Sequence, residues 1–183
     1  MSEPRRPHRA WKVWLLACFL ALPSWALAAP ASGAPLPPFT GEDLLGRKHL
    51  GDEYAGRPTL LVAITDKNAG ETMREWFEAA DRHAPASVQR ESIISLRLPF
   101  FVGINTVRRR VKAQVPREHW DDTLLDRDGA IAQALGLESS RQPYVFVLDA
   151  NGRVLARVHA SASSPEAQRI WSALATTQAP GSP

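Results

Sequence analysis

Cysteine, the residue type that could carry the most chemistry, occurs once in this sequence, at Cys18. Cys18 lies inside an apolar N-terminal run that has the features of a removable leader. If the leader is removed, the mature chain contains no thiol. Thiol–disulfide exchange, peroxidatic chemistry and thiolate metal sites are then excluded for the mature chain, because each requires a cysteine sulfur.

The histidines do not form a recognisable metal site. His8 would leave with the leader, and the other four histidines are His49, His83, His119 and His159. None of these four belongs to an i, i+4 pair or has an acidic residue at ligand spacing. A site assembled from distant parts of the chain is the alternative. We interpret these residues as surface or helix-end histidines and predict no metal and no cofactor.

Two clusters of charged residues are further candidates. Turn chemistry explains the acidic cluster, because no downstream glutamate stands where a calcium loop requires one. The basic cluster lies on a predicted helix, where consecutive arginines spread around the circumference and favour a solvated surface. The alternative is contact with a partner or an anionic surface, which Trp120 could anchor unless it belongs to the core. The acidic cluster is Asp121, Asp122, Asp126 and Asp128; the basic one is Arg108, Arg109, Arg110, Lys112 and Arg117.

The first 28 residues resemble a secretory signal peptide. A basic segment precedes the apolar run 14–22, and Ala26-Leu27-Ala28 supplies a small-residue cleavage site. We therefore predict cleavage after Ala28 and a periplasmic or otherwise exported protein. Twin-arginine export through Arg5-Arg6, a lipoprotein box at Cys18 and an uncleaved membrane anchor over 12–29 are alternatives.

The leader also explains the positive charge of the chain. It holds four of the 22 basic residues and one of the 19 acidic ones, so the mature chain would be formally neutral. The sequence pI of about 9.4 is therefore no evidence for nucleic-acid binding, and we predict no nucleic-acid partner. A membrane contact is expected only if the leader stays attached.

The apolar patterns predict an α/β domain. A continuous apolar run over 59–65 is typical of a strand buried on both faces. Met73, Trp76, Phe77 and Ala80 then recur at the spacing of one helix face. The remaining predicted strands are 91–98, 120–125, 143–149 and 154–159, and the remaining helices are 107–115, 130–135 and 164–174. This order predicts a parallel first half and an antiparallel second half.

The domain boundaries follow from composition. Residues 29–37 are small and proline-rich, which predicts a flexible lead-in. Residues 38–175 form the predicted domain, and 176–183 form a predicted disordered tail.

This order of elements resembles the thioredoxin-like fold, in particular the exported branch of TlpA-like and AhpC/TSA-like proteins. Three pieces carry the resemblance: 38–40 with 46–50 and 56–62; 124–129 with 130–137; and 142–149 with 151–153. The resemblance implies a central mixed β-sheet flanked by helices. It also places the family's redox cysteine pair at Ala69, Gly70, Glu71 and Thr72, where this chain has a degenerate loop.

The resemblance also implies that Pro143 is cis and faces this loop. Pro143 could equally be a retained turn that holds the start of a strand. Thr72 stands near a helix N-terminus, and we interpret it as a cap or first-turn residue, because its hydroxyl gains little acidity there.

The sequence therefore favours a cysteine-less, non-catalytic binding or accessory protein of the cell envelope, with an envelope protein or a small ligand as partner. The alternative is a redox-related accessory protein, in antioxidant defence or cytochrome maturation, as family membership would imply. A metal chaperone is a third possibility. No catalytic residue is predicted.

Overall fold

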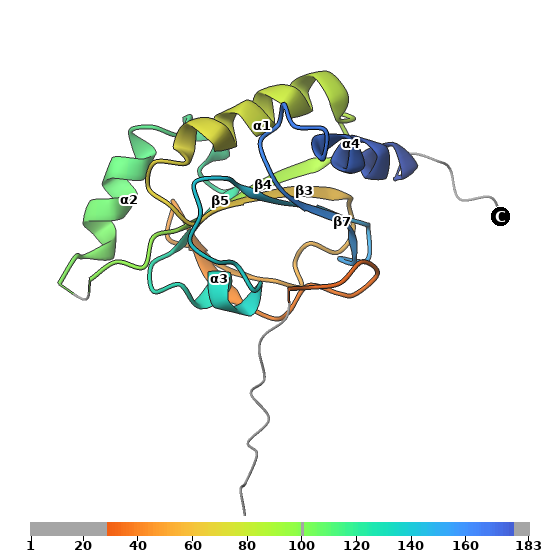
Figure 1. Ribbon diagram of the computed structural model, residues 1–183. Helices are drawn as coiled ribbons and strands as arrows, with labels where there is room; N and C mark the ends of the chain where they lie inside the picture. Colours follow the sequence, from red (N-terminus) through yellow and green to blue (C-terminus); the bar gives the residue numbers. More distant parts are fainter. Residues whose placement is uncertain (1–28, 100, 178–183) are drawn as a thin grey trace, which may run out of the picture.

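Residues 29–99 and 101–177 are described by the computed structural model (Figure 1). Within them, seven strands form one mixed sheet in the order β2-β1-β5-β4-β3-β6-β7. The strands are β1 (Thr40–Asp43), β2 (Lys48–Leu50), β3 (Thr59–Ile64), β4 (Gln89–Ser95), β5 (Thr123–Asp126), β6 (Tyr144–Leu148) and β7 (Val154–His159). The helices are α1 (Gly70–His83), α2 (Ile104–Lys112), α3 (Ala130–Ala134) and α4 (Ala167–Thr176), with a 3₁₀ turn at Arg117–His119.

The strand directions confirm the predicted fold class. β3 pairs in parallel with β4, and β4 pairs in parallel with β5. β6 pairs antiparallel with β3 and β7, and β1 pairs antiparallel with β2 and β5. The result is a mixed sheet flanked by helices, with α1 and α4 above it and α3 below it in Figure 1.

Two hydrophobic cores separate the layers. All six residues of β3 are buried, because alternate side chains enter opposite cores. Leu60 and Val62 pack toward α1 and α4, whereas Leu61 and Ala63 pack toward α3. Trp76 of α1 is fully buried in the first core. Its Nε1 donates to the carbonyl oxygen of Ala160 at 3.0 Å, which satisfies its polar atom.

Much of the segment 29–37, predicted as a flexible lead-in, is bonded to a distant strand. The amide of Gly33 donates to the carbonyl of Val154 at 2.7 Å, and the Val154 amide donates to Ala34 at 2.9 Å. Leu36 is buried in the core on the α3 side. Proline-rich composition marks the absence of helix, but it does not prevent an extended segment from pairing with a distant strand.

Two predicted boundaries also shift. β4 ends at Ser95 rather than continuing to 98, and Thr176 is the last residue of α4 rather than part of a tail. The predicted signal peptide, Cys18 and residues 178–183 lie outside the described residues. In the part of the chain that is described, none of the helices combines the length and the apolar character needed to cross a bilayer.

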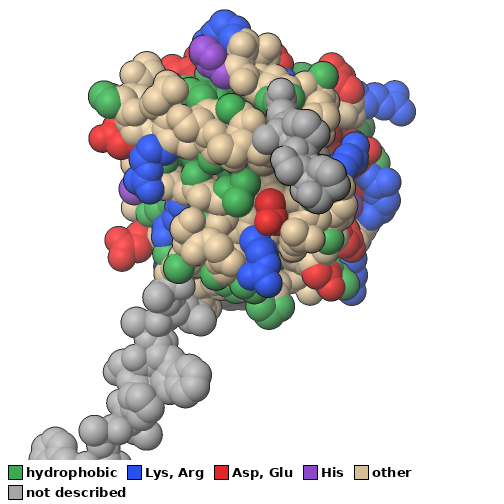
Figure 2. Space-filling model, turned by 90° about the vertical axis from the view of Figure 1, so that its right-hand side faces the viewer, with side chains coloured by type: hydrophobic (Ala, Val, Ile, Leu, Met, Phe, Trp, Pro, Cys, Tyr) green, Lys and Arg blue, Asp and Glu red, His purple; other side chains and the backbone are tan. Residues whose placement is uncertain are grey.

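Charges are interspersed on the side of the molecule where α4 and β7 lie. Figure 2 shows Lys and Arg side chains next to Asp and Glu side chains on this face. On the described part of this face, the Lys and Arg side chains do not gather into one continuous positive patch. This distribution agrees with the charge balance of the chain beyond residue 28.

Candidate functional site

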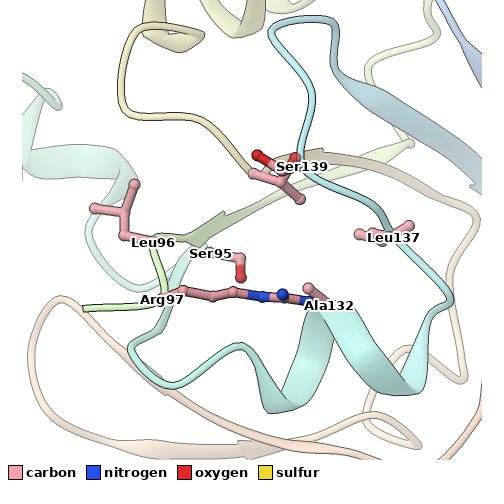
Figure 3. A pocket seen from close by; sticks show the side chains of 7 residues that line it. Ser95, Leu96, Arg97, Ala132, Leu137 and Ser139 are labelled. Carbon is pink, nitrogen blue, oxygen red and sulfur yellow. The ribbon is translucent and has the colours of Figure 1, made fainter. Parts of the chain in front are cut away.

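A small hollow lies beside the ends of the two central parallel strands. Its volume is about 180 Å³, and Figure 3 shows the side chains that surround it. They come from the end of β3, the end of β4, α3 and the segment that follows α3: Thr65, Ser95, Leu96, Arg97, Ala132, Leu137 and Ser139. Ligands of α/β proteins commonly bind outside the carboxyl ends of parallel strands. The hollow is therefore the first place to look for function.

Thr65 fixes one wall of the hollow. Its Oγ1 donates to the carbonyl of Glu138 at 2.8 Å and accepts from the amide of Ser140 at 2.9 Å. One hydroxyl therefore holds the segment before β6 against the end of β3. This contact joins parts of the chain about 75 residues apart.

Arg97, just beyond the end of β4, also lines the hollow. The amides of its two neighbours, Leu96 and Leu98, donate to the carbonyls of Asp126 and Arg127 at 3.1 and 2.8 Å. Residue 97 bulges between these two bonds. Its φ of 30° is positive, which residues other than glycine rarely adopt. In Figure 3 its side chain runs from the end of β4 toward Ala132 of α3.

A serine and a histidine meet in the segment that follows Ser139, a residue that lines the hollow. The Oγ of Ser140 lies 2.8 Å from Nε2 of His159 and accepts from the amide of Gln142 at 3.0 Å. The imidazole stacks on Tyr144, with ring centroids 3.9 Å apart. A serine nucleophile needs a base that is oriented by a third group. Among the described residues no carboxylate bonds to His159, so the pair has the geometry of a loop contact.

Two comparisons with known proteins found no match: no family model and no curated protein matches the chain. Solved structures do match. A Chlorobium tepidum protein assigned as the thiol:disulfide interchange protein DsbE superposes with a TM-score of 0.58 at 18% identity, over 80% of this chain and 99% of that one. The chain has a thioredoxin-like fold.

Two further thioredoxin-like structures have similar overlap. BsSco, a member of the Sco family of cytochrome c oxidase assembly proteins, matches with a TM-score of 0.56 at 13% identity, over 84% of this chain and 98% of that one. The exposed lipoprotein thioredoxin Etrx1 of Streptococcus pneumoniae matches with a TM-score of 0.53 at 15% identity, over 76% and 98%.

The loop 69–72, which the resemblance aligns with the redox cysteines, lies at the start of α1. Ala69 is buried at the N-cap, Gly70 begins the helix, and Glu71 forms an ion pair with Arg74. Thr72 is a first-turn residue, as predicted, and its Oγ1 donates to the carbonyl of Ala69 at 2.8 Å. The hydroxyl thus donates to the backbone, and among the residues that the structure describes no base bonds to it.

The cis peptide implied for Pro143 is not present. The bond is trans, the isomer that an X–Pro bond prefers by about 0.5–1 kcal/mol. Pro143 is buried and leads into β6, which is the role of a turn that holds the start of a strand. The segment before it does lie against the degenerate loop, because the carbonyl of Arg141 is 3.4 Å from Oγ1 of Thr72.

The basic residues of α2 are not brought to the hollow. Arg108 donates to Glu42 at 2.7 Å and to Asn105 at 2.9 Å, whereas Arg109 and Arg110 are exposed. Trp120 packs partly into the core and lies under Lys112. Whether this surface meets a partner stays a prediction.

The aspartates divide between the two ends of β5. Asp126 ends the strand and is buried, and its two carboxylate oxygens accept from the amides of Gly129 and Ala132 at 3.0 and 2.9 Å. Asp128 accepts from the amide of Ala130 at 3.2 Å. These bonds are the turn chemistry that the sequence predicts. Asp121 and Asp122 precede the strand at its other end.

One ionic cluster was missed by sequence reasoning. His49 lies between two carboxylates, 3.1 Å from Asp43 and 3.0 Å from Glu53, and Arg47 donates to Asp43 at 2.7 Å. Burial alone would raise the pKa of Asp43, but hydrogen bonds from Arg47 and His49 hold it below its ordinary value. The i, i+4 spacings of Asp43 with Arg47 and of His49 with Glu53 were the available signals, so the statement that no histidine has an acidic residue at such spacing is wrong for His49.

A second titratable group lies on the α3 side of the sheet. Glu91 of β4 is buried, and its burial raises its pKa to about 8. Its Oε1 accepts from Gln89 Nε2 at 2.6 Å, which opposes the shift, whereas the charge of Asp122 adds to it. No local sequence pattern marks this residue, because its burial depends on what covers the sheet.

Proposed function

We propose that this chain is an exported, non-catalytic binding or accessory protein of the cell envelope, with a thioredoxin-like fold. One observation carries the proposal: the loop 69–72, which the family resemblance aligns with the redox cysteines, has no thiol, and its Thr72 hydroxyl donates to the Ala69 carbonyl. A hydroxyl that donates its proton to a carbonyl and has no base beside it is a poor nucleophile.

The size of the hollow supports a polypeptide partner. Pockets that enclose drug-sized ligands measure about 300–1,000 Å³, and this hollow measures about 180 Å³. A single side chain or a chain end fits such a volume better than a cofactor does. Ser95 and Ser139 bring hydroxyl groups to its lining.

Export is supported by the leader pattern and by one structural neighbour. Residues 1–28 have the charge and apolar pattern of a signal peptide. Etrx1, which shares the fold, is an exposed lipoprotein. Expression of the full chain, followed by fractionation and N-terminal sequencing, tests this part. A mature protein that begins at Ala29 and leaves with the periplasm supports export, whereas an intact N-terminus in the cytosol contradicts it.

A redox-related accessory role is the second candidate. It is favoured by the neighbours, because DsbE is assigned to thiol:disulfide interchange and BsSco to a cytochrome c oxidase assembly family. In such a role this chain would hold a thiol-bearing partner, and the partner would supply the sulfur chemistry.

Thiol assays separate catalysis from binding. The purified full chain and its Cys18→Ser variant are tested for insulin reduction and peroxide consumption, and the variant removes the leader thiol as a source of activity. We expect no turnover by either form. Turnover that survives Cys18→Ser would refute the non-catalytic proposal. A pull-down from the envelope extract of its own cell should return a partner, and an empty result at high loading would count against binding.

A further inference from the structure

Arg97 is held in a conformation that the polypeptide backbone disfavours. Among the described residues it is the one non-glycine position with positive φ, at 30°. Backbone bonds on both sides hold this conformation, because the Leu96 amide donates to Asp126 at the end of β5 and the Leu98 amide donates to Arg127 just beyond it. Such strain persists only where surrounding structure maintains it, and it concentrates at functional sites. The bulge is therefore a place to ask what the side chain is aimed at.

Gly129 makes room for the arginine side chain. A Cβ atom at this glycine would lie 2.9 Å from Cγ and 3.0 Å from Nε of Arg97, and the glycine itself has φ 84°. Glycine satisfies both requirements at once, because it adopts the left-handed conformation and has no side chain. The arginine accordingly lies across Gly129 toward Ala132, where Figure 3 shows it along the hollow.

The guanidinium has no ion-pair partner within the part of the chain that is described. Asp126, the buried carboxylate at the end of β5, accepts from backbone amides with both of its oxygens. Asp128 accepts from the amide of Ala130. An arginine that is positioned by backbone strain, beside a hollow and without a counter-charge, has the geometry of a receptor for an anion.

We propose that this hollow recognises a carboxylate group of a polypeptide partner through Arg97. The planar guanidinium suits a carboxylate, which accepts two parallel N–H bonds. The side chains of Ser95 and Ser139 line the same hollow, and those of Leu96 and Leu137 provide apolar contact for the carbon atoms beside the carboxylate. This inference rests on the proposed binding function and names the chemistry of its ligand.

The two sources of a carboxylate on a polypeptide are its C-terminus and an acidic side chain. Three acetylated tripeptides distinguish them: Ala-Ala-Leu with a free C-terminus, Ala-Ala-Leu amide, and Ala-Glu-Ala amide. Each is titrated into the ¹⁵N-labelled full chain, and the backbone amide shifts are followed. We expect millimolar binding of at least one carboxylate peptide, with shifts at 95–97, 129–132 and 137–139. The amide without a carboxylate should produce no such shifts.

The Arg97→Gly variant tests the proposal without endangering the fold, because glycine adopts positive φ without strain. We expect this variant to fold at least as stably as the parent and to bind the carboxylate peptide at least tenfold more weakly. Arg169→Gln, which removes the same charge from an exposed position on α4, should leave binding unchanged.

Three results would overturn the inference: unchanged binding by Arg97→Gly, no shifts at the hollow with either carboxylate peptide at 20 mM, or equal binding of inorganic phosphate. Failure of the proposed function is recognised separately, by thiol turnover or an empty pull-down. A partner recovered from the envelope without carboxylate binding would remove this inference alone.

Discussion

Replacing Glu91 with glutamine should make the protein more stable at neutral and alkaline pH. Glu91 is 6% exposed on β4 and accepts a hydrogen bond from Gln89 at 2.6 Å. A glutamine oxygen can accept the same bond, so the substitution removes ionisation and keeps the contact. The amide of Ser92 donates to the carbonyl of Asp122 at 2.8 Å, so the neighbouring strand brings a second acidic residue close to Glu91.

The sign of the effect follows from the pKa. Burial raises the pKa of Glu91 from an ordinary 4.5 to about 8 in the folded protein. Between these two values the unfolded chain releases the proton and the folded chain retains it. The stability that protonation contributes is therefore complete below pH 4.5 and is lost as the pH rises through 8. At about 1.4 kcal/mol per pH unit, the loss reaches about 3 kcal/mol by pH 7.

Urea unfolding followed by far-UV circular dichroism measures this loss. Parent and Glu91→Gln are compared at pH 5, 6, 7 and 8, with Glu75→Gln as a matched control at an exposed position on α1. We expect the two unfolding free energies to differ by less than about 1 kcal/mol at pH 5 and by about 4 kcal/mol at pH 8, in favour of Glu91→Gln. Parallel pH profiles for the parent and Glu91→Gln would refute the reasoning.

Two further substitutions test how the site and the lead-in are held. Asp126→Asn should lower the free energy of unfolding by about 2 kcal/mol, because the new amide nitrogen cannot accept from one of the two buried N–H groups. Asp128→Asn is the control at an exposed position. Equal losses of stability in the two variants would contradict this account. Leu36→Ala should cost about 2–3 kcal/mol because Leu36 is buried, whereas Leu45→Ala, at a position 51% exposed, should change stability little. Thermal and urea unfolding measure both, and a lead-in that does not pack would make the two leucine variants equal.

Local patterns predicted the elements that frame the site. β3 is recognisable from its continuous apolar run. α1 is recognisable because Met73, Trp76 and Ala80 recur with the helical period of 3.6 residues. The pairing of the segment 31–36 was not predicted, because it depends on a partner far away in the sequence. Its backbone bonds reach Val154, about 120 residues away, and no periodicity inside the segment records that partner. β4 was predicted too long, because the bulge at Arg97 is made by bonds to Asp126 and Arg127.

The sequence by itself determined that the chain beyond residue 28 has no thiol of its own for thiol chemistry, because the absence of cysteine is a matter of composition. It also determined the order of strands and helices, which depends on local patterns of apolar residues. Only the tertiary structure decided which side chains act together. Arg97 meets Gly129, and His49 meets Asp43, through contacts set by strand register and by turns. Charge and reactivity depend on such neighbours, and Glu91 acquires its raised pKa from the layers that bury it.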